Sequence, residues 1–145
     1  VHTAPRPGQW GIPTDWSPDG KYVAVQLERG RDAVTDFALV PTEGGEPRVV
    51  KTAVFKRQYR TKILFSPDGK YLAFDYPPDP DQKMNGDIFV VPAAGGTEVA
   101  IAPHSAQDTL IGWAPDGSLL FASDRTGSRA LYKVKMLDGR QQGEP

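Results

Sequence analysis

Cysteine is absent from this sequence of 145 residues. Its absence excludes a fold held by disulfide bonds and any zinc site built on thiolates. An excess of one charge is also lacking, because 17 Lys and Arg stand against 18 Asp and Glu. That balance argues against a nucleic-acid-binding module that depends on overall basicity. No apolar run approaches the roughly 18 residues of a membrane-spanning helix, so we expect no membrane span.

Glycine and proline are abundant, with 15 and 14 residues. This density divides a chain into short elements and disfavours long helices. No stretch of ten residues has the apolar period of a helix, and we expect none. Hydrophobic residues make up 39% of the chain and charged residues 24%, as in a globular domain. We therefore expect one all-β domain over residues 1–145.

An internal repeat organises the chain. Ser17-Pro18-Asp19-Gly20 recurs as Ser66-Pro67-Asp68-Gly69 and again as Ala114-Pro115-Asp116-Gly117, at offsets of 49 and 48 residues. An aromatic residue precedes each copy (Trp16, Phe65 and Trp113), and an apolar strand pattern follows it. Each copy is followed by a second apolar segment and a glycine turn, at Gly44-Gly45, Gly95-Gly96 and Asp138-Gly139. Repeats of 40–50 residues are typical of stacked units such as β-propeller blades.

The repeated motif has the chemistry of a hairpin turn. Proline presets φ at the first central position, aspartate suits the second, and glycine accepts the positive φ that closes the hairpin. We therefore assign structural turn roles to Pro18, Asp19, Gly20, Pro67, Asp68, Gly69, Pro115, Asp116 and Gly117. The glycine turns join two further strands in each unit.

Each unit is thus predicted to be a four-stranded antiparallel meander. The expected strands cover 12–16, 22–27, 36–41 and 47–52; 61–65, 71–76, 87–92 and 97–102; and 109–113, 119–124, 130–136 and 140–144. Such sheets stack around an axis as blades. The sequence therefore predicts a β-propeller segment of three blades, at approximately 10–52, 60–102 and 108–145.

The run aromatic-Ser-Pro-Asp-Gly-Lys-Tyr-Val/Leu-Ala resembles the TolB-like (WD-like) propeller repeat. The third unit extends the resemblance with Ser123-Asp124-Arg125-Thr126-Gly127 and Ala130-Leu131-Tyr132. The first two units depart from it there, with Glu28-Arg29-Gly30-Arg31-Asp32 and a Pro-rich insert at 77–81. The resemblance implies a bacterial, periplasmic or extracellular protein. The repeat occurs in translocation proteins, peptidases and sensors, so the resemblance implies a fold rather than a function.

Three blades are fewer than the four to eight of a closed propeller. We expect two open apolar flanks, covered either by the remaining blades of a larger chain or by a second copy in a six-bladed ring. The fragment is the favoured interpretation. Trp16 and Trp113 are expected in the core or between blades.

Candidate binding residues lie in the loops that join the blades. The basic segment 51–62 contains Lys56, Arg57 and Arg60 beside Tyr59, a combination that can hold a carboxylate, a phosphate or an acidic peptide. A solvated linking loop is the simpler interpretation of this segment.

His104 and Asp108 form the second candidate, since a His and an Asp four residues apart can act as acid and base. No nucleophile accompanies them, and an exposed loop histidine is the simpler interpretation. The acidic run 75–87 could offer oxygen ligands to calcium, but its spacing is not that of an EF-hand and we assign no metal. Arg125 and Asp124 are expected to be structural.

Two functions remain open. The first is a non-catalytic module that binds a protein or peptide. The second is the substrate-gating propeller of a prolyl-oligopeptidase-like or tricorn-like peptidase whose catalytic domain lies outside this chain. We predict no catalytic residues, no cofactor and no nucleic-acid partner.

Overall fold

Short strands separated by tight turns make up the computed structural model, which describes residues 10–29, 34–54, 61–79 and 86–145. The first sheet contains β1 (Trp10–Trp16), β2 (Tyr22–Arg29), β3 (Val34–Pro41) and β4 (Arg48–Val54). The second contains β5 (Ile63–Phe65), β6 (Tyr71–Tyr76), β7 (Asp87–Pro92) and β8 (Val99–Ile101). The third contains β9 (Asp108–Trp113), β10 (Leu119–Ser123), β11 (Ala130–Leu137) and β12 (Arg140–Gln142).

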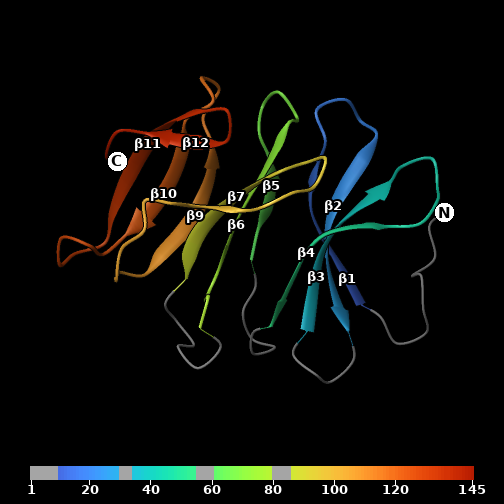
Figure 1. Ribbon diagram of the computed structural model, residues 1–145, viewed down its shortest axis with the longest axis horizontal. Coiled ribbons are helices and arrows are strands. Elements are labelled where there is room, and N and C mark those ends of the chain that lie inside the picture. Colours follow the sequence, from blue (N-terminus) through green and yellow to red (C-terminus); the bar gives the residue numbers. More distant parts are fainter. Residues whose placement is uncertain (1–9, 30–33, 55–60, 80–85) are drawn as a thin grey trace.

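All three sheets are antiparallel meanders, with the strands in sequence order. They stand side by side in Figure 1, from the blue and teal sheet through the green and yellow one to the orange and red one. No helix occurs in the described parts of the chain, and thus none that could cross a membrane. The predicted all-β propeller segment is confirmed. The fourth strands are the least accurate part of the prediction, because β8 and β12 have three residues each.

The three repeated motifs form the predicted hairpin turns. In each, the glycine amide donates to the backbone carbonyl three residues earlier, at 2.8–2.9 Å, and the glycine has a φ of 72–78°. Ser17 N donates to Tyr22 O and Ser66 N to Tyr71 O, whereas Ala114 N donates to Ser118 O, one residue closer. The third hairpin is therefore one residue shorter.

The shorter hairpin shifts the register of the third sheet. Leu119 and Phe121 occupy the places of Leu72 and Phe74, and all four side chains are fully buried. The offset between these units after the turn is therefore 47 residues. Simple alignment of the motifs puts Phe121 opposite Ala73, which belongs to the other face of its sheet, because adjacent strand residues point to opposite faces.

The innermost strands β1, β5 and β9 connect the blades through polar contacts. Thr14 Oγ1 donates to Ile63 O at 2.9 Å, and Phe65 N donates to Asp15 Oδ2 at 2.7 Å. One blade further on, the indole Nε1 of Trp113 donates to Leu64 O at 3.2 Å. Trp113 thus packs between blades as expected.

Trp16 does not follow the prediction, because 59% of its surface is exposed. It holds the position of Trp113 in the first sheet, on the side that faces away from the second sheet. At the other flank, Leu131 and Leu137 of β11 are 77% and 60% exposed. Their own blade does not cover these side chains, so they would become buried only against a neighbouring sheet.

Candidate functional site

The four residues of the basic segment that are predicted to bind a ligand lie outside the described residues. Lys56, Arg57, Tyr59 and Arg60 all fall in the range 55–60, for which no placement is described. Their role stays a prediction. Lys51, at the start of the same segment, is described, and its Nζ lies 2.6 Å from Glu98 Oε1 across the first blade interface.

His104 and Asp108, the second predicted pair, have different environments. His104 is exposed, and its Nδ1 accepts a hydrogen bond from Ala106 N at 3.1 Å. Asp108 is buried, and its Oδ2 lies 2.9 Å from Arg125 Nη2. Burial raises the pKa of Asp108, although the Ser123 hydroxyl and the Arg125 guanidinium both lower it. No hydrogen bond joins His104 and Asp108 in the described part of the chain.

Arg125 has the structural role that the sequence predicts. Its Nη2 also donates to Ala102 O at 3.1 Å, and its Nε donates to Ser123 Oγ at 3.0 Å. The guanidinium lies 5.0 Å from the ring centres of both Phe121 and Tyr132. With three hydrogen-bond acceptors and two rings around it, this side chain joins the second and third blades.

The aspartates of the repeated motif are also occupied within their own turns. Asp19 Oδ1 accepts hydrogen bonds from Ser17 Oγ at 2.7 Å and Lys21 N at 3.1 Å, and Asp68 has the same partners one blade later. These bonds lower the pKa of both carboxyls. In the third hairpin Lys133 has the largest effect and lowers the pKa of Asp116 to about 2.

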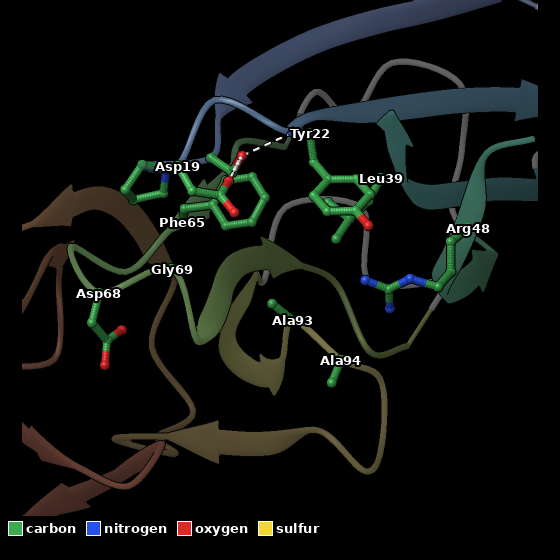
Figure 2. Close-up of a pocket in the computed structure, with 11 residues that line it drawn as sticks. Asp19, Tyr22, Leu39, Arg48, Phe65, Asp68, Gly69, Ala93 and Ala94 are labelled. Atoms are coloured by element: carbon green, nitrogen blue, oxygen red, sulfur yellow. Dashed lines mark hydrogen bonds between the residues drawn. The ribbon is translucent and has the colours of Figure 1, made fainter. Parts of the chain in front are cut away.

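A groove opens between the first and second hairpins, with a volume of about 430 Å³. One wall carries Asp19 and Tyr22, and the opposite wall carries Asp68 with Ala93 and Ala94. Leu39, Phe65 and the side chain of Arg48 also line the groove, and Figure 2 shows them around the opening. A groove of this size accommodates a few side chains of a ligand.

A second groove of about 350 Å³ occupies the same place between the second and third hairpins. Tyr71 takes the position of Tyr22, and Trp113 that of Phe65. The Asp138-Gly139 turn lies on the Tyr71 ring, since a Cβ added at Gly139 would come within 2.5 Å of it. The grooves are therefore related by the repeat but differ in how their tyrosine is covered.

Sequence reasoning placed the binding residues at the loops between blades and missed these grooves. In a meander the first and third turns lie at one edge of the sheet, and the second turn lies at the opposite edge with the links between sheets. Both grooves lie at the hairpin edge. The available signal was the tyrosine two residues after each Asp-Gly turn glycine in the first two units, at Tyr22 and Tyr71.

No protein-family model and no curated protein matches this sequence. Three solved structures are similar to the chain. TolB from Acinetobacter baumannii has a TM-score of 0.70 at 21% identity, over 92% of this chain and 32% of that one. A putative TolB from Agrobacterium tumefaciens has a TM-score of 0.53 at 21% identity, over 89% of this chain and 59% of that one. An oligogalacturonate lyase in complex with manganese has a TM-score of 0.66 at 18% identity, over 92% of this chain and 37% of that one.

The chain therefore spans between about a third and three fifths of the length of the structures that it matches. At these identities the similarity concerns the fold and not the activity. The predicted resemblance to TolB-like propellers is confirmed at that level: the chain has the fold of a three-blade segment of a TolB-like β-propeller.

Proposed function

We propose that this chain is a non-catalytic propeller module that binds a protein or a peptide. The observation that supports the proposal most strongly is the pair of grooves at the hairpin edge, which the repeat places next to each other. Both combine aromatic and aliphatic lining with charged rims. Such mixed surfaces suit polypeptide ligands, which offer both kinds of group.

The proposal is tested with a phage-displayed library of random octapeptides selected on the immobilised chain. We expect enriched sequences that bind the folded chain when synthesised and labelled, as measured by fluorescence anisotropy. The matched control is the chain unfolded in urea and immobilised in the same way. Failure to enrich any peptide specific for the folded chain would contradict the proposal.

We further propose that a neighbouring blade covers each open flank. Trp113 and Trp16 hold corresponding positions, and among the described residues only Trp113 has a carbonyl partner on a preceding blade. The covering blade belongs to a longer chain or to a second copy. Light scattering over a dilution series separates the two, since a closed ring of two copies has twice the 15.8 kDa of one chain.

The substrate-gating propeller of a peptidase remains the alternative. It differs from the first proposal in requiring a catalytic domain in the same gene, which the complete open reading frame reveals. One similar structure is a lyase, so enzymes also use this fold. For compartment, we propose a periplasmic or extracellular site in a bacterium, in keeping with the TolB-like fold. A periplasmic extract probed with an antibody to the chain tests it.

A further inference from the structure

Arg48 differs from the other charged side chains of the first groove. It is the first residue of β4, is exposed, and lines the groove from the first blade. Its guanidinium lies 6.0 Å from the centre of the Tyr22 ring, at the outer limit of a cation–π contact. Among the described residues it has no ion pair. The fork of guanidinium N–H donors that binds a carboxylate in bidentate geometry is thus available.

The two carboxylates of the same groove are already neutralised. Asp19 and Asp68 accept hydrogen bonds within their own hairpins, and Lys21 Nζ and Lys70 Nζ lie 3.7 and 3.5 Å from their second oxygens. Among the charged side chains that line this groove, Arg48 is therefore the one without an ion pair in the described part of the chain. A ligand group of negative charge is favoured beside it.

The second groove shows what the same architecture looks like without this cation. Arg48 pairs with Leu39 in the register of β3 and β4, and Val99 pairs with Val90 in the register of β7 and β8. Val99 thus stands in the place of Arg48. The lining of the second groove also contains Asp138, in addition to Asp68 and Asp116, which pair with Lys70 and Lys133. The lining of the first groove therefore has a cation, Arg48, where the second has a valine, and the second has an additional carboxylate.

The apolar lining of the first groove completes the recognition chemistry. Leu39 is 1% exposed and Phe65 is 7% exposed, so the floor is firmly packed, and the half-buried Tyr22 is the aromatic side chain that offers accessible surface. An aliphatic or aromatic side chain next to a carboxylate would contact this floor while the carboxylate reached Arg48.

We propose that the first groove binds an extended peptide segment in which an Asp or Glu side chain stands next to an apolar residue, with Arg48 holding the carboxylate. This inference rests on the proposed function and specifies its site and ligand. It places recognition at the hairpin edge, opposite the edge to which the links between blades belong.

The test uses peptides enriched from the octapeptide library, synthesised with amidated C-termini so that only side chains supply carboxylates. We expect Asp or Glu beside an apolar residue in the enriched set. Arg48→Ala should weaken binding at least tenfold, and Arg48→Lys should weaken it less. The matched control is Arg129→Ala, because Arg129 is also exposed but lies at the opposite edge beside Thr109.

A double-mutant cycle locates the contact. Replacing the acidic residue of the peptide by its amide should weaken binding to the wild-type chain. The same replacement should change binding to the Arg48→Ala variant very little. Thermal unfolding followed by circular dichroism checks that both variants fold. Selection of basic peptides, or peptides that bind Arg48→Ala as tightly as wild type, would overturn this site while leaving the binding module intact. The absence of any binding peptide would overturn both proposals.

Discussion

The two blade interfaces of this molecule are built from different side chains. Aromatic rings dominate the first, where Phe74 lies 4.9 Å from Phe37 and 6.3 Å from Phe89, and Tyr76 lies 4.7 Å from Phe89, between ring centres. The second is mainly aliphatic, and its fully buried members are Ala73, Ile88, Val90, Ile101, Leu110, Leu119, Phe121 and Val134.

The ion pairs of the two interfaces differ in how deeply they are buried. The Lys51–Glu98 pair of the first interface has side chains 28% and 21% exposed, whereas Arg125 and Asp108 in the second are 12% and 0% exposed. The first pair keeps some contact with solvent, and Glu98 Oε1 also accepts a hydrogen bond from the Tyr76 hydroxyl at 2.9 Å, so this carboxylate depends less on its lysine. Burial makes the second pair important, because neither charge has water as a substitute partner. One repeat thus supports two ways of joining blades.

The largest effect is expected from Phe74→Ala, which would disrupt the first interface. Phe74 is fully buried, and deletion of a buried phenylalanine ring costs about 3–5 kcal/mol. Urea unfolding measures the loss. Trp16→Ala removes an aromatic ring that is 59% exposed and should cost less than about 1 kcal/mol. Equal losses would contradict the assignment of Phe74 to an interface core.

Arg125→Met would disrupt the second interface. It leaves Asp108 buried without its cation, and breaking such a pair costs about 3 kcal/mol. The double variant Arg125→Met with Asp108→Asn should recover much of this stability, as measured by thermal unfolding. Lys51→Met, the matched change in the first interface, should cost about 1 kcal/mol or less. A larger loss for Lys51→Met would reverse the comparison.

Gly69→Val would strain the hairpin of the middle blade, which contributes to both interfaces. Gly69 has a φ of 72°, and a residue with a Cβ in this region costs about 1–2 kcal/mol. The nearest atom to an added Cβ, in Pro18, is 3.5 Å away, so the strain comes from the backbone. Asp79→Ala, at an exposed position, is the control. Equal melting temperatures would contradict the turn assignment.

Asp87→Asn should have the smallest effect and should stabilise the chain. Asp87 Oδ1 is buried without a hydrogen-bond partner among the described residues. Burial raises the pKa of Asp87, and the charge of Asp108 raises it further. The folded chain therefore binds this proton more tightly than the unfolded chain. Asp87 lowers stability above its folded pKa, and the penalty disappears as the pH falls below the ordinary value of 3.8.

We expect Asp87→Asn to raise the free energy of unfolding by less than about 1 kcal/mol at pH 7 and to leave it unchanged at pH 3. Melting temperatures measured at both values test this, with Glu43→Gln, at an exposed position, as the control. A gain that is the same at both pH values would show that the carboxyl does not titrate as described.

The fold was predictable because its signal is local and repeated. A proline, an aspartate and a glycine at fixed spacing determine the hairpins, and three copies reveal the period. The one-residue shortening at Ala114 was less visible, since it depends on which backbone groups pair. The exposure of Trp16 could not be inferred from its own blade, because a neighbouring sheet determines it.

The candidate grooves were harder to predict than the strands. Arg48 and Tyr22 are 26 positions apart in the sequence and meet through the register of β2, β3 and β4. The facing wall comes from another blade, at Asp68 and Ala93. No single motif contains this set of residues. His104 and Asp108 are only four residues apart in the sequence, yet His104 is exposed and Asp108 is buried.

The sequential order of the strands has a consequence for how such a chain can change over time. Every hydrogen-bonded strand pair joins neighbours in the sequence, so the duplication or deletion of one repeat re-pairs no strand within a sheet. Only the contacts between sheets must be re-established. Evolution can therefore lengthen or shorten a protein of this kind by whole blades, while each sheet retains the local turns that direct its folding.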